Sequence, residues 1–125
     1  MTHPVRAAIE ARDIDSLKAL FAEGIVFNSP VAFHPFVGRE TVAEVLSHVM
    51  EVFTDFLYVD ELTGDGTHAL VFSAGVGGRA VLGLDHLRYD DDGLVSEFTV
   101  MVRPLSGLIA LAEAMGPRVA HLAKG

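Results

Sequence analysis

The chain has 125 residues, half of them hydrophobic, and its mean hydropathy is +0.40. A chain of this length forms one domain, and it is too small to bury that much apolar surface, so we expect an internal cavity, a subunit interface, or both. The formal net charge is −8, and the nine Lys and Arg residues are scattered, which argues against nucleic acid and anionic membrane surfaces as partners.

The N-terminal residues predict two helices and a short strand. Pro4 fits the first turn of a helix, where its missing N–H costs nothing. Asp13 is placed as the N-cap of a second helix, whose apolar residues recur at helical spacing until Gly24, which we expect to end it. Residues 25–27 follow as a strand, and Pro30 stops it.

A third helix begins at Gly38, after a loop over 31–38 that contains two aromatic residues, a histidine and a proline. Its apolar residues recur at i, i+3, i+4, i+7, i+8 and i+11, which predicts one continuous apolar face. These residues are Val42, Val45, Leu46, Val49, Met50 and Phe53.

The pattern then changes to strands joined by turns. An antiparallel meander is predicted over 54–63, 67–76, 79–90 and 94–103. The turns fall at Asp65-Gly66, Gly77-Gly78 and Asp91-Asp92-Gly93, and we expect the first to be type I′, in which both central residues have positive φ.

Pro104 ends the last strand, and helical spacing returns over 105–115. Gly116-Pro117 is expected to interrupt this helix and leave a short tail helix. We expect residues 105–123 to form a C-terminal helical extension that covers the open end of the pocket or makes a subunit contact. It would bury Leu108, Ile109 and Met115.

This order of elements predicts a single α+β domain over 1–125. N-terminal helices cover a strongly curved antiparallel sheet, and a C-terminal helix is added. A curved sheet closed on one side by helices forms a cone, so the fold predicts a pocket.

Several features that the sequence lacks limit the kinds of site and the cellular location that we expect. There is no cysteine, so a disulfide framework, thiolate metal ligands and a cysteine nucleophile are excluded. The first residues lack the charged and apolar parts of a signal peptide, and no apolar run approaches the ~20 residues of a membrane helix, so we expect a cytoplasmic protein. No His or Asp cluster has metal-ligand spacing, and we predict no metal and no cofactor.

The last hairpin fixes its own register. If Asp90 pairs with Val95, Arg88 lies opposite Glu97 as a cross-strand ion pair, which a shift of one residue would lose. Asp85 then lies opposite Val100, on a face that is otherwise apolar. Its other residues are Val81, Gly83, Leu87, Phe98 and Val102.

Asp85 is therefore the main candidate for a functional residue. An isolated carboxyl group among apolar neighbours has a raised pKa, because desolvation disfavours the charged form. The neutral acid can donate a hydrogen bond to a carbonyl or phenolate oxygen of a ligand. The alternative is a structural role, in which Asp85 pairs with a buried amide or a neighbouring side chain.

Two further residues are candidates for acid–base chemistry. His34 lies on the loop at the expected pocket mouth, where it could act as an acid or base, or else it only packs on that loop. Asp60 would form an acid–base pair with Asp85 if it faced inward, but its strand is apolar on both faces and does not orient it.

Several motifs occur together in the order found in a known superfamily. They are Leu84-Asp85-His86-Leu87-Arg88-Tyr89 with Asp92-Gly93-Leu94-Val95, Asp13-Ile14-Asp15-Ser16-Leu17, Ser29-Pro30, and Gly38-Arg39-Glu40-Thr41-Val42. The chain resembles, over nearly its whole length, the nuclear transport factor 2-like superfamily, in particular its SnoaL-like and ketosteroid isomerase branches.

The resemblance implies that Asp85 matches the aspartic acid that stays protonated in steroid isomerases and hydrogen-bonds the substrate oxyanion. The general-base aspartate of that family falls at Ser29, and its oxyanion-hole tyrosine falls at about Val5. Because neither residue can replace the original group, steroid isomerisation by the familiar mechanism is not expected.

We therefore predict a protein that binds a small, largely apolar molecule, such as a steroid-, polyketide- or terpene-like compound. Asp85 would be the polar anchor, in a pocket lined by Phe27, Ser29, Phe53, Phe56, Val81, Leu87, Phe98, Val100 and Val102. One alternative is an isomerase, cyclase or hydrolase that uses Asp85 with Asp60 or His34. Another is a structural or regulatory homodimer formed through the convex face of the sheet, around Leu82, Leu84 and Met101, and we expect a homodimer in any case.

Overall fold

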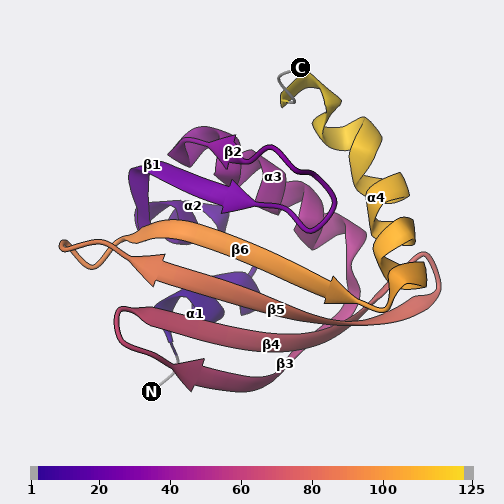
Figure 1. Cartoon of the computed structure of the whole chain (residues 1–125), viewed down its shortest axis with the longest axis horizontal. Coiled ribbons are helices and arrows are strands. Elements are labelled where there is room, and N and C mark those ends of the chain that lie inside the picture. The colour runs from indigo at the N-terminus through magenta and orange to yellow at the C-terminus, as the bar shows by residue number, and fades with distance from the viewer. Residues whose placement is uncertain (1–2, 123–125) are drawn as a thin grey trace.

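The computed structural model describes residues 3–122 of the chain. Three helices and two strands come first: α1 (Pro4–Glu10), α2 (Ile14–Ala19), β1 (Phe21–Asn28), β2 (Phe36–Val37) and α3 (Arg39–Val52). The meander follows, with β3 (Thr54–Thr63), β4 (Thr67–Val76), β5 (Arg79–Tyr89) and β6 (Val95–Arg103). The described part ends with α4 (Leu105–Val119) and the short 3-10 helix η1 (Ala120–Leu122) (Figure 1).

The strands form one six-stranded sheet in the order β2-β1-β6-β5-β4-β3. All neighbouring pairs are antiparallel except β1 and β6, which run parallel because α3 and the meander separate them in the chain. The predicted α+β class is confirmed, and the sheet is antiparallel as predicted except for the pair of β1 and β6. The strong curvature predicted for the sheet remains a prediction.

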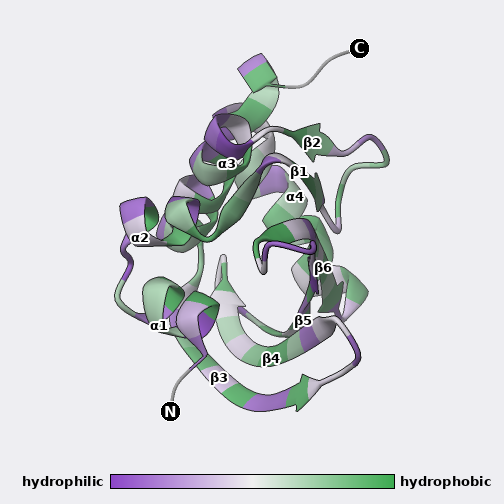
Figure 2. Cartoon of the chain, turned by 90° about the vertical axis from the view of Figure 1, so that its left-hand side faces the viewer, coloured by the Kyte–Doolittle hydropathy of each residue, from purple (hydrophilic) through white to green (hydrophobic). Residues whose placement is uncertain are grey.

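The helices lie on one side of the sheet. Figure 2 shows α1, α2 and α3 together on that side, and α3 packs against α2, β1 and α4. The apolar face predicted for α3 is confirmed, because Val42, Val45 and Leu46 are buried. Near the start of β5, α4 packs so closely on the sheet that a Cβ on Gly107 would lie 2.3 Å from Cγ1 of Val81.

The predicted register of β5 and β6 is confirmed. Arg88 pairs with Glu97, with 3.5 Å between Nε and Oε1, and Asp85 pairs with Val100. Asp85 therefore lies on the face of the sheet that the helices cover, as the ion pair between Arg88 and Glu97 requires.

Two predicted ends of helices are wrong. Gly24 lies within β1, and α2 already ends at Ala19. The side chains of Phe21 and Ile25 are fully buried as parts of β1, and the register of the β1–β6 pair shifts between Phe21 and Val26, around this glycine. Burial in the core therefore outweighed the helical spacing that includes Phe21.

The second error concerns Gly116-Pro117, through which α4 continues to Val119. A proline in the last turn removes few helical hydrogen bonds, and the turn is held from outside, because Arg118 donates to Glu51 of α3 over 3.1 Å. Met115 is buried as predicted, but Ile109 is 49% exposed and Leu108 is only half-buried. Residue 123 of the predicted extension lies outside the described residues.

The turns of two predicted hairpins, at Gly77-Gly78 and at Asp65-Gly66, differ in backbone geometry. Gly77 and Gly78 both have positive φ, at 56° and 79°, as a type I′ turn requires. At the first hairpin only Gly66 has positive φ, and the N–H of Gly64 donates to the carbonyl oxygen of Thr67 over 3.0 Å. The prediction of a type I′ turn at Asp65-Gly66 is therefore wrong.

Candidate functional site

A cavity of about 550 Å³ lies between the helices and the sheet. Residues from α1, β1, the loop after β1, α3, the four strands of the meander and α4 line it. Most of its wall is apolar: Ile9, Phe27, Phe36, Val45, Leu46, Val49, Met50, Phe53, Phe56, Phe72, Phe98, Val100, Leu111 and Met115. Such a volume and such a lining are typical of small-molecule sites.

Aromatic rings form the part of the wall nearest to β3 and β4. The ring of Phe72 stacks on that of Phe56 with centroids 4.8 Å apart, and it meets Phe53 at 5.5 Å. Gly83 on β5 leaves the space for this ring, since a Cβ there would lie 2.1 Å from Cζ of Phe72. The glycine therefore sets the shape of the wall through its missing side chain.

Asp85 is the buried polar group of this cavity. Its side chain is 5% exposed, and Oδ2 accepts a hydrogen bond of 2.9 Å from the hydroxyl group of Tyr58. Oδ1 has no hydrogen-bond partner among the described residues. Every fully buried side-chain oxygen or nitrogen atom of the described residues has a hydrogen-bond partner. Because Oδ1 has none, it is not fully buried, and its accessible surface faces the cavity that Asp85 lines.

The surroundings of Asp85 and Tyr58 favour their protonated forms. Burial raises the pKa of Asp85 to about 7, although the hydrogen bond from Tyr58 opposes this rise. Burial also raises the pKa of Tyr58, and the charge of Asp85 adds to that effect. Asp85 is therefore more readily protonated than an exposed aspartic acid, and Tyr58 remains a hydrogen-bond donor.

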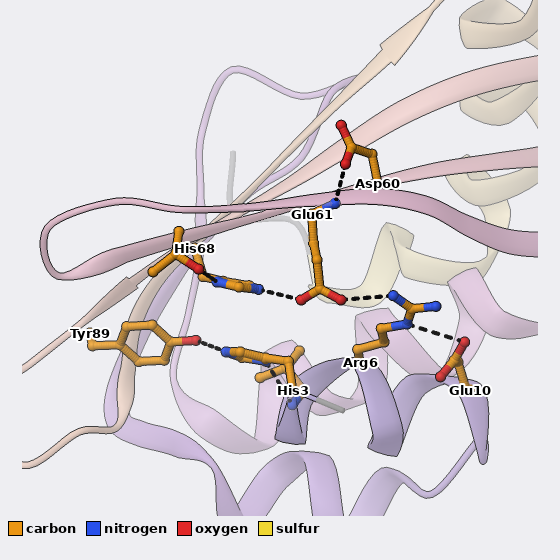
Figure 3. A network of polar contacts seen from close by, with 9 residues as sticks. His3, Arg6, Glu10, Asp60, Glu61, His68 and Tyr89 are labelled. Carbon is orange, nitrogen blue, oxygen red and sulfur yellow. Dashed lines mark hydrogen bonds and ion pairs between the residues drawn. The ribbon is translucent and has the colours of Figure 1, made fainter. Parts of the chain in front are cut away.

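A polar network behind Tyr58 fastens α1 to the sheet (Figure 3). Arg6 lies on α1 and donates to Oε1 of Glu61 over 2.8 Å, while Oε2 of Glu61 is 2.8 Å from Nε2 of His68. The guanidinium carbon of Arg6 is 5.6 Å from the ring centroid of Tyr58, within reach of a cation–π contact. The network thus supports the tyrosine that holds Asp85.

His3 completes the network at the start of α1. Its ring stacks on that of His68 with centroids 4.1 Å apart, Nε2 meets the hydroxyl group of Tyr89, and Nδ1 accepts from the N–H of Val5 over 3.2 Å. Because Nδ1 is an acceptor, His3 is neutral with its proton on Nε2. Burial, followed by the charge of His68, lowers the pKa of His3.

Six of the nine predicted pocket residues line the cavity: Phe27, Ser29, Phe53, Phe56, Phe98 and Val100. Val81, Leu87 and Val102 do not line it, although they share a face of the sheet with Asp85. Val81 is covered by α4 at Gly107, Leu87 is fully buried in the core, and Val102 packs against the core. These three residues lie nearer the strand ends, where helices or loops close over the sheet.

The structure does not bring Asp60 or His34 to Asp85. A register shift between Tyr58 and Asp60 leaves Tyr58 facing inward and Asp60 exposed, and the carboxylate of Asp60 accepts from the N–H of Glu61 over 2.9 Å. The exposed ring of His34 packs edge-on against Phe33, and His34 does not line the cavity. Tyr58, which the sequence analysis missed, is the partner of Asp85, and its i+2 spacing from Phe56 could have revealed it.

Comparison with known proteins identifies the family. The family model described as the SnoaL-like domain matches residues 5–110. The chain belongs to the SnoaL-like domain family. The resemblance predicted from the sequence is thereby confirmed.

This SnoaL-like domain is similar to solved structures. It is 45% identical to a steroid delta-isomerase from Pseudomonas aeruginosa, over 93% of this chain and 86% of that one, with a TM-score of 0.87. It is 32% identical to an uncharacterized protein conserved in bacteria with a cystatin-like fold from Silicibacter pomeroyi, over 94% and 83% of the chains, with a TM-score of 0.89. No curated protein matches the chain.

A more distant structure shares the fold alone. It is a hypothetical protein with a ketosteroid isomerase-like fold from Catenulispora acidiphila, and it holds trimethylamine. The identity is 16%, the match covers 86% of this chain and 87% of that chain, and the TM-score is 0.65.

The two positions that resemblance to steroid isomerases singles out carry no acid–base group in this SnoaL-like domain. Ser29 lines the cavity, but its Oγ accepts from the N–H of Val31 over 3.1 Å, and Val5 is a buried apolar residue of α1. Within residues 3–122, no group of three His, Cys, Asp or Glu side chains could hold a metal ion. No helix of that range is both long and apolar enough to cross a membrane.

Proposed function

We propose that this SnoaL-like domain binds a small, largely apolar molecule in the cavity, with Asp85 as its polar anchor. One observation carries the proposal: a buried carboxyl group presents one oxygen to a mostly apolar cavity of about 550 Å³. That volume suits steroid-, polyketide- or terpene-like compounds, and a single polar group fixes the orientation of such a ligand.

The hydrogen bond from Tyr58 decides which ligand group Asp85 receives. Tyr58 donates to Oδ2, so the proton of the neutral acid belongs on Oδ1, which faces the cavity. There it donates to a carbonyl or phenolic oxygen of the ligand. A ligand without that oxygen leaves the carboxyl group desolvated and unpaired, which costs binding free energy.

Matched ligands test this proposal. Isothermal titration at pH 6 compares an oxosteroid with the analogue in which the ketone is replaced by CH₂, using wild-type protein and the Asp85→Leu variant. We expect the wild type to prefer the ketone about tenfold and the variant to lose that preference, because a buried hydrogen bond contributes about 1–1.5 kcal/mol. Equal affinities in the wild type, or no binding of either steroid, would contradict the proposal.

A second candidate function is that of an isomerase, cyclase or hydrolase in which Asp85 acts as the acid or hydrogen-bond donor. Its support is the 45% identity to a steroid delta-isomerase. Apart from Asp85, the carboxyl group among the residues that line the cavity is that of Glu10, which would have to act as the base. The assay follows, by absorbance, the conversion of a β,γ-unsaturated ketone into the conjugated enone. Turnover by the wild type that is lost in both Asp85→Asn and Glu10→Gln would support an enzyme. Turnover that is unchanged in both variants would contradict this assignment of roles.

We also propose that a second copy of the chain covers the outer face of the sheet. Leu57 and Met101 on that face are 58% and 56% exposed, and Val71, Leu84 and Met101 lie side by side across three strands. Val71 and Leu84 are half-buried, and an apolar row that is open to solvent at Met101 is typical of an interface. Sedimentation at micromolar concentration should show a dimer that Met101→Lys dissociates, whereas a wild-type monomer would contradict it. The cytoplasmic location remains a prediction.

A further inference from the structure

Arg12 is the one basic residue among the residues that line the cavity, and its backbone is strained. It has φ of 55°, in the left-handed region that favours glycine. Its N–H donates to the carbonyl oxygen of Ile9 over 3.0 Å, and the N–H of Asp13 donates to that of Ala8 over 2.9 Å. These two bonds form a Schellman motif at the end of α1, and Arg12 occupies the position that is usually glycine.

The fold gives little reason for arginine at this position. The guanidinium of Arg12 has no ion pair or hydrogen bond among the described residues, whereas Glu10, the nearby acid of the cavity wall, lies 3.4 Å from Nε of Arg6. A cation at the end of a helix interacts favourably with the helix dipole. However, α1 has only seven residues, and a basic residue in its last turn would provide the same interaction without a left-handed backbone.

We propose that Arg12 binds a carboxylate at one end of the ligand. This inference rests on the proposed function and adds a substrate class to it: an apolar molecule with a carbonyl or phenolic oxygen for Asp85 and a carboxylate for Arg12. The guanidinium offers a planar pair of donors that matches the two oxygens of a carboxylate. Arg12 lines the cavity just after α1, and Asp85 lines it from β5 in the sheet, so we infer that the two groups bind different parts of one ligand.

An oxosteroid carboxylic acid and its methyl ester test this inference by isothermal titration at pH 7.5. The wild type should bind the acid about two- to fivefold more tightly than the ester, which is the range for one exposed charge pair. The Arg12→Gln variant should bind the two compounds equally and keep the wild-type affinity for the ester. Arg79, which is exposed and does not line the cavity, provides the control, and Arg79→Gln should leave both affinities unchanged.

A glycine variant separates a binding role from a structural one. Arg12→Gly relieves the left-handed backbone, so its melting temperature should equal or exceed that of the wild type, while its preference for the acid is lost. Equal binding of acid and ester by the wild type, or an equal loss of both in Arg12→Gln, would overturn the role of Arg12. If the ester still binds through Asp85, the proposed function survives that result, whereas binding of neither compound overturns both.

Discussion

Replacing Asp85 by asparagine should stabilise the protein at alkaline pH. Asparagine has the shape of the protonated acid, and its amide oxygen can accept the hydrogen bond that Tyr58 donates to Oδ2. Unlike the acid, it never places a charge in the apolar wall of the cavity. Burial raises the pKa of Asp85 from 3.8 to about 7, so the folded protein holds this proton more tightly than the unfolded chain does.

The sign and the size of the effect follow from proton linkage. Between the two pKa values the folded state binds more protons than the unfolded state, and the free energy of unfolding therefore falls as the pH rises. At about 1.4 kcal/mol for each unit of pKa, the interval from 3.8 to about 7 corresponds to about 4 kcal/mol. The two proteins should be about equally stable below pH 4, and Asp85→Asn should be more stable by several kcal/mol at pH 8.

Urea denaturation at half-unit steps from pH 4 to pH 8 measures this difference. Subtracting the wild-type curve from that of the variant removes the contribution of every other titrating group, including that of His3. The difference should grow by up to about 1.4 kcal/mol for each pH unit and level off above pH 7. Parallel curves, or a variant that is less stable at pH 8, would refute the reasoning that Asp85 is buried without a compensating charge.

Three other substitutions test the surroundings of the site. Tyr58→Phe removes the hydrogen bond that lowers the pKa of Asp85, so the carboxyl carbon of Asp85 should titrate at higher pH by carbon-13 NMR, and an unchanged titration would exclude this role. Gly83→Ala places a methyl group 2.1 Å from Phe72 and should lower the free energy of unfolding by about 1–3 kcal/mol, measured by urea denaturation. The control Gly24→Ala, where a Cβ has no atom within 4 Å, should lower it much less. Equal losses of stability in the two variants would refute the packing argument. The pKa of His3 is lowered on folding, so the unfolded chain takes up a proton at a higher pH than the folded protein does. The wild type should therefore lose stability relative to His3→Asn as the pH falls below 6.5. A constant difference between the two denaturation curves would contradict this.

The sheet was predictable because its residues constrain one another. Opposite charges at Arg88 and Glu97 allow a single register for β5 and β6, and that register places Asp85 opposite Val100 on the covered face. The paired glycines at Gly77-Gly78 likewise specify their turn, since both have positive φ. Where local signals and packing agree, the sequence was sufficient.

Other features depend on interactions that a linear pattern does not contain. The spacing of Phe21 suits a helix, but burial of this side chain in the core draws it into β1. The register shift after Tyr58 turns Asp60 outward, so alternation alone could not identify the partner of Asp85. The left-handed backbone of Arg12 was equally hidden, because nothing in the local sequence marks a Schellman motif that lacks glycine.

A crystal structure of the protein with a bound oxosteroid tests the central claim most directly. The account predicts that the ketone oxygen of the steroid lies about 2.6–3.0 Å from Oδ1 of Asp85, while Tyr58 still donates to Oδ2. A steroid bound outside the cavity, or bound inside it with the ketone pointing away from Asp85, would contradict the claim that this carboxyl group anchors the ligand.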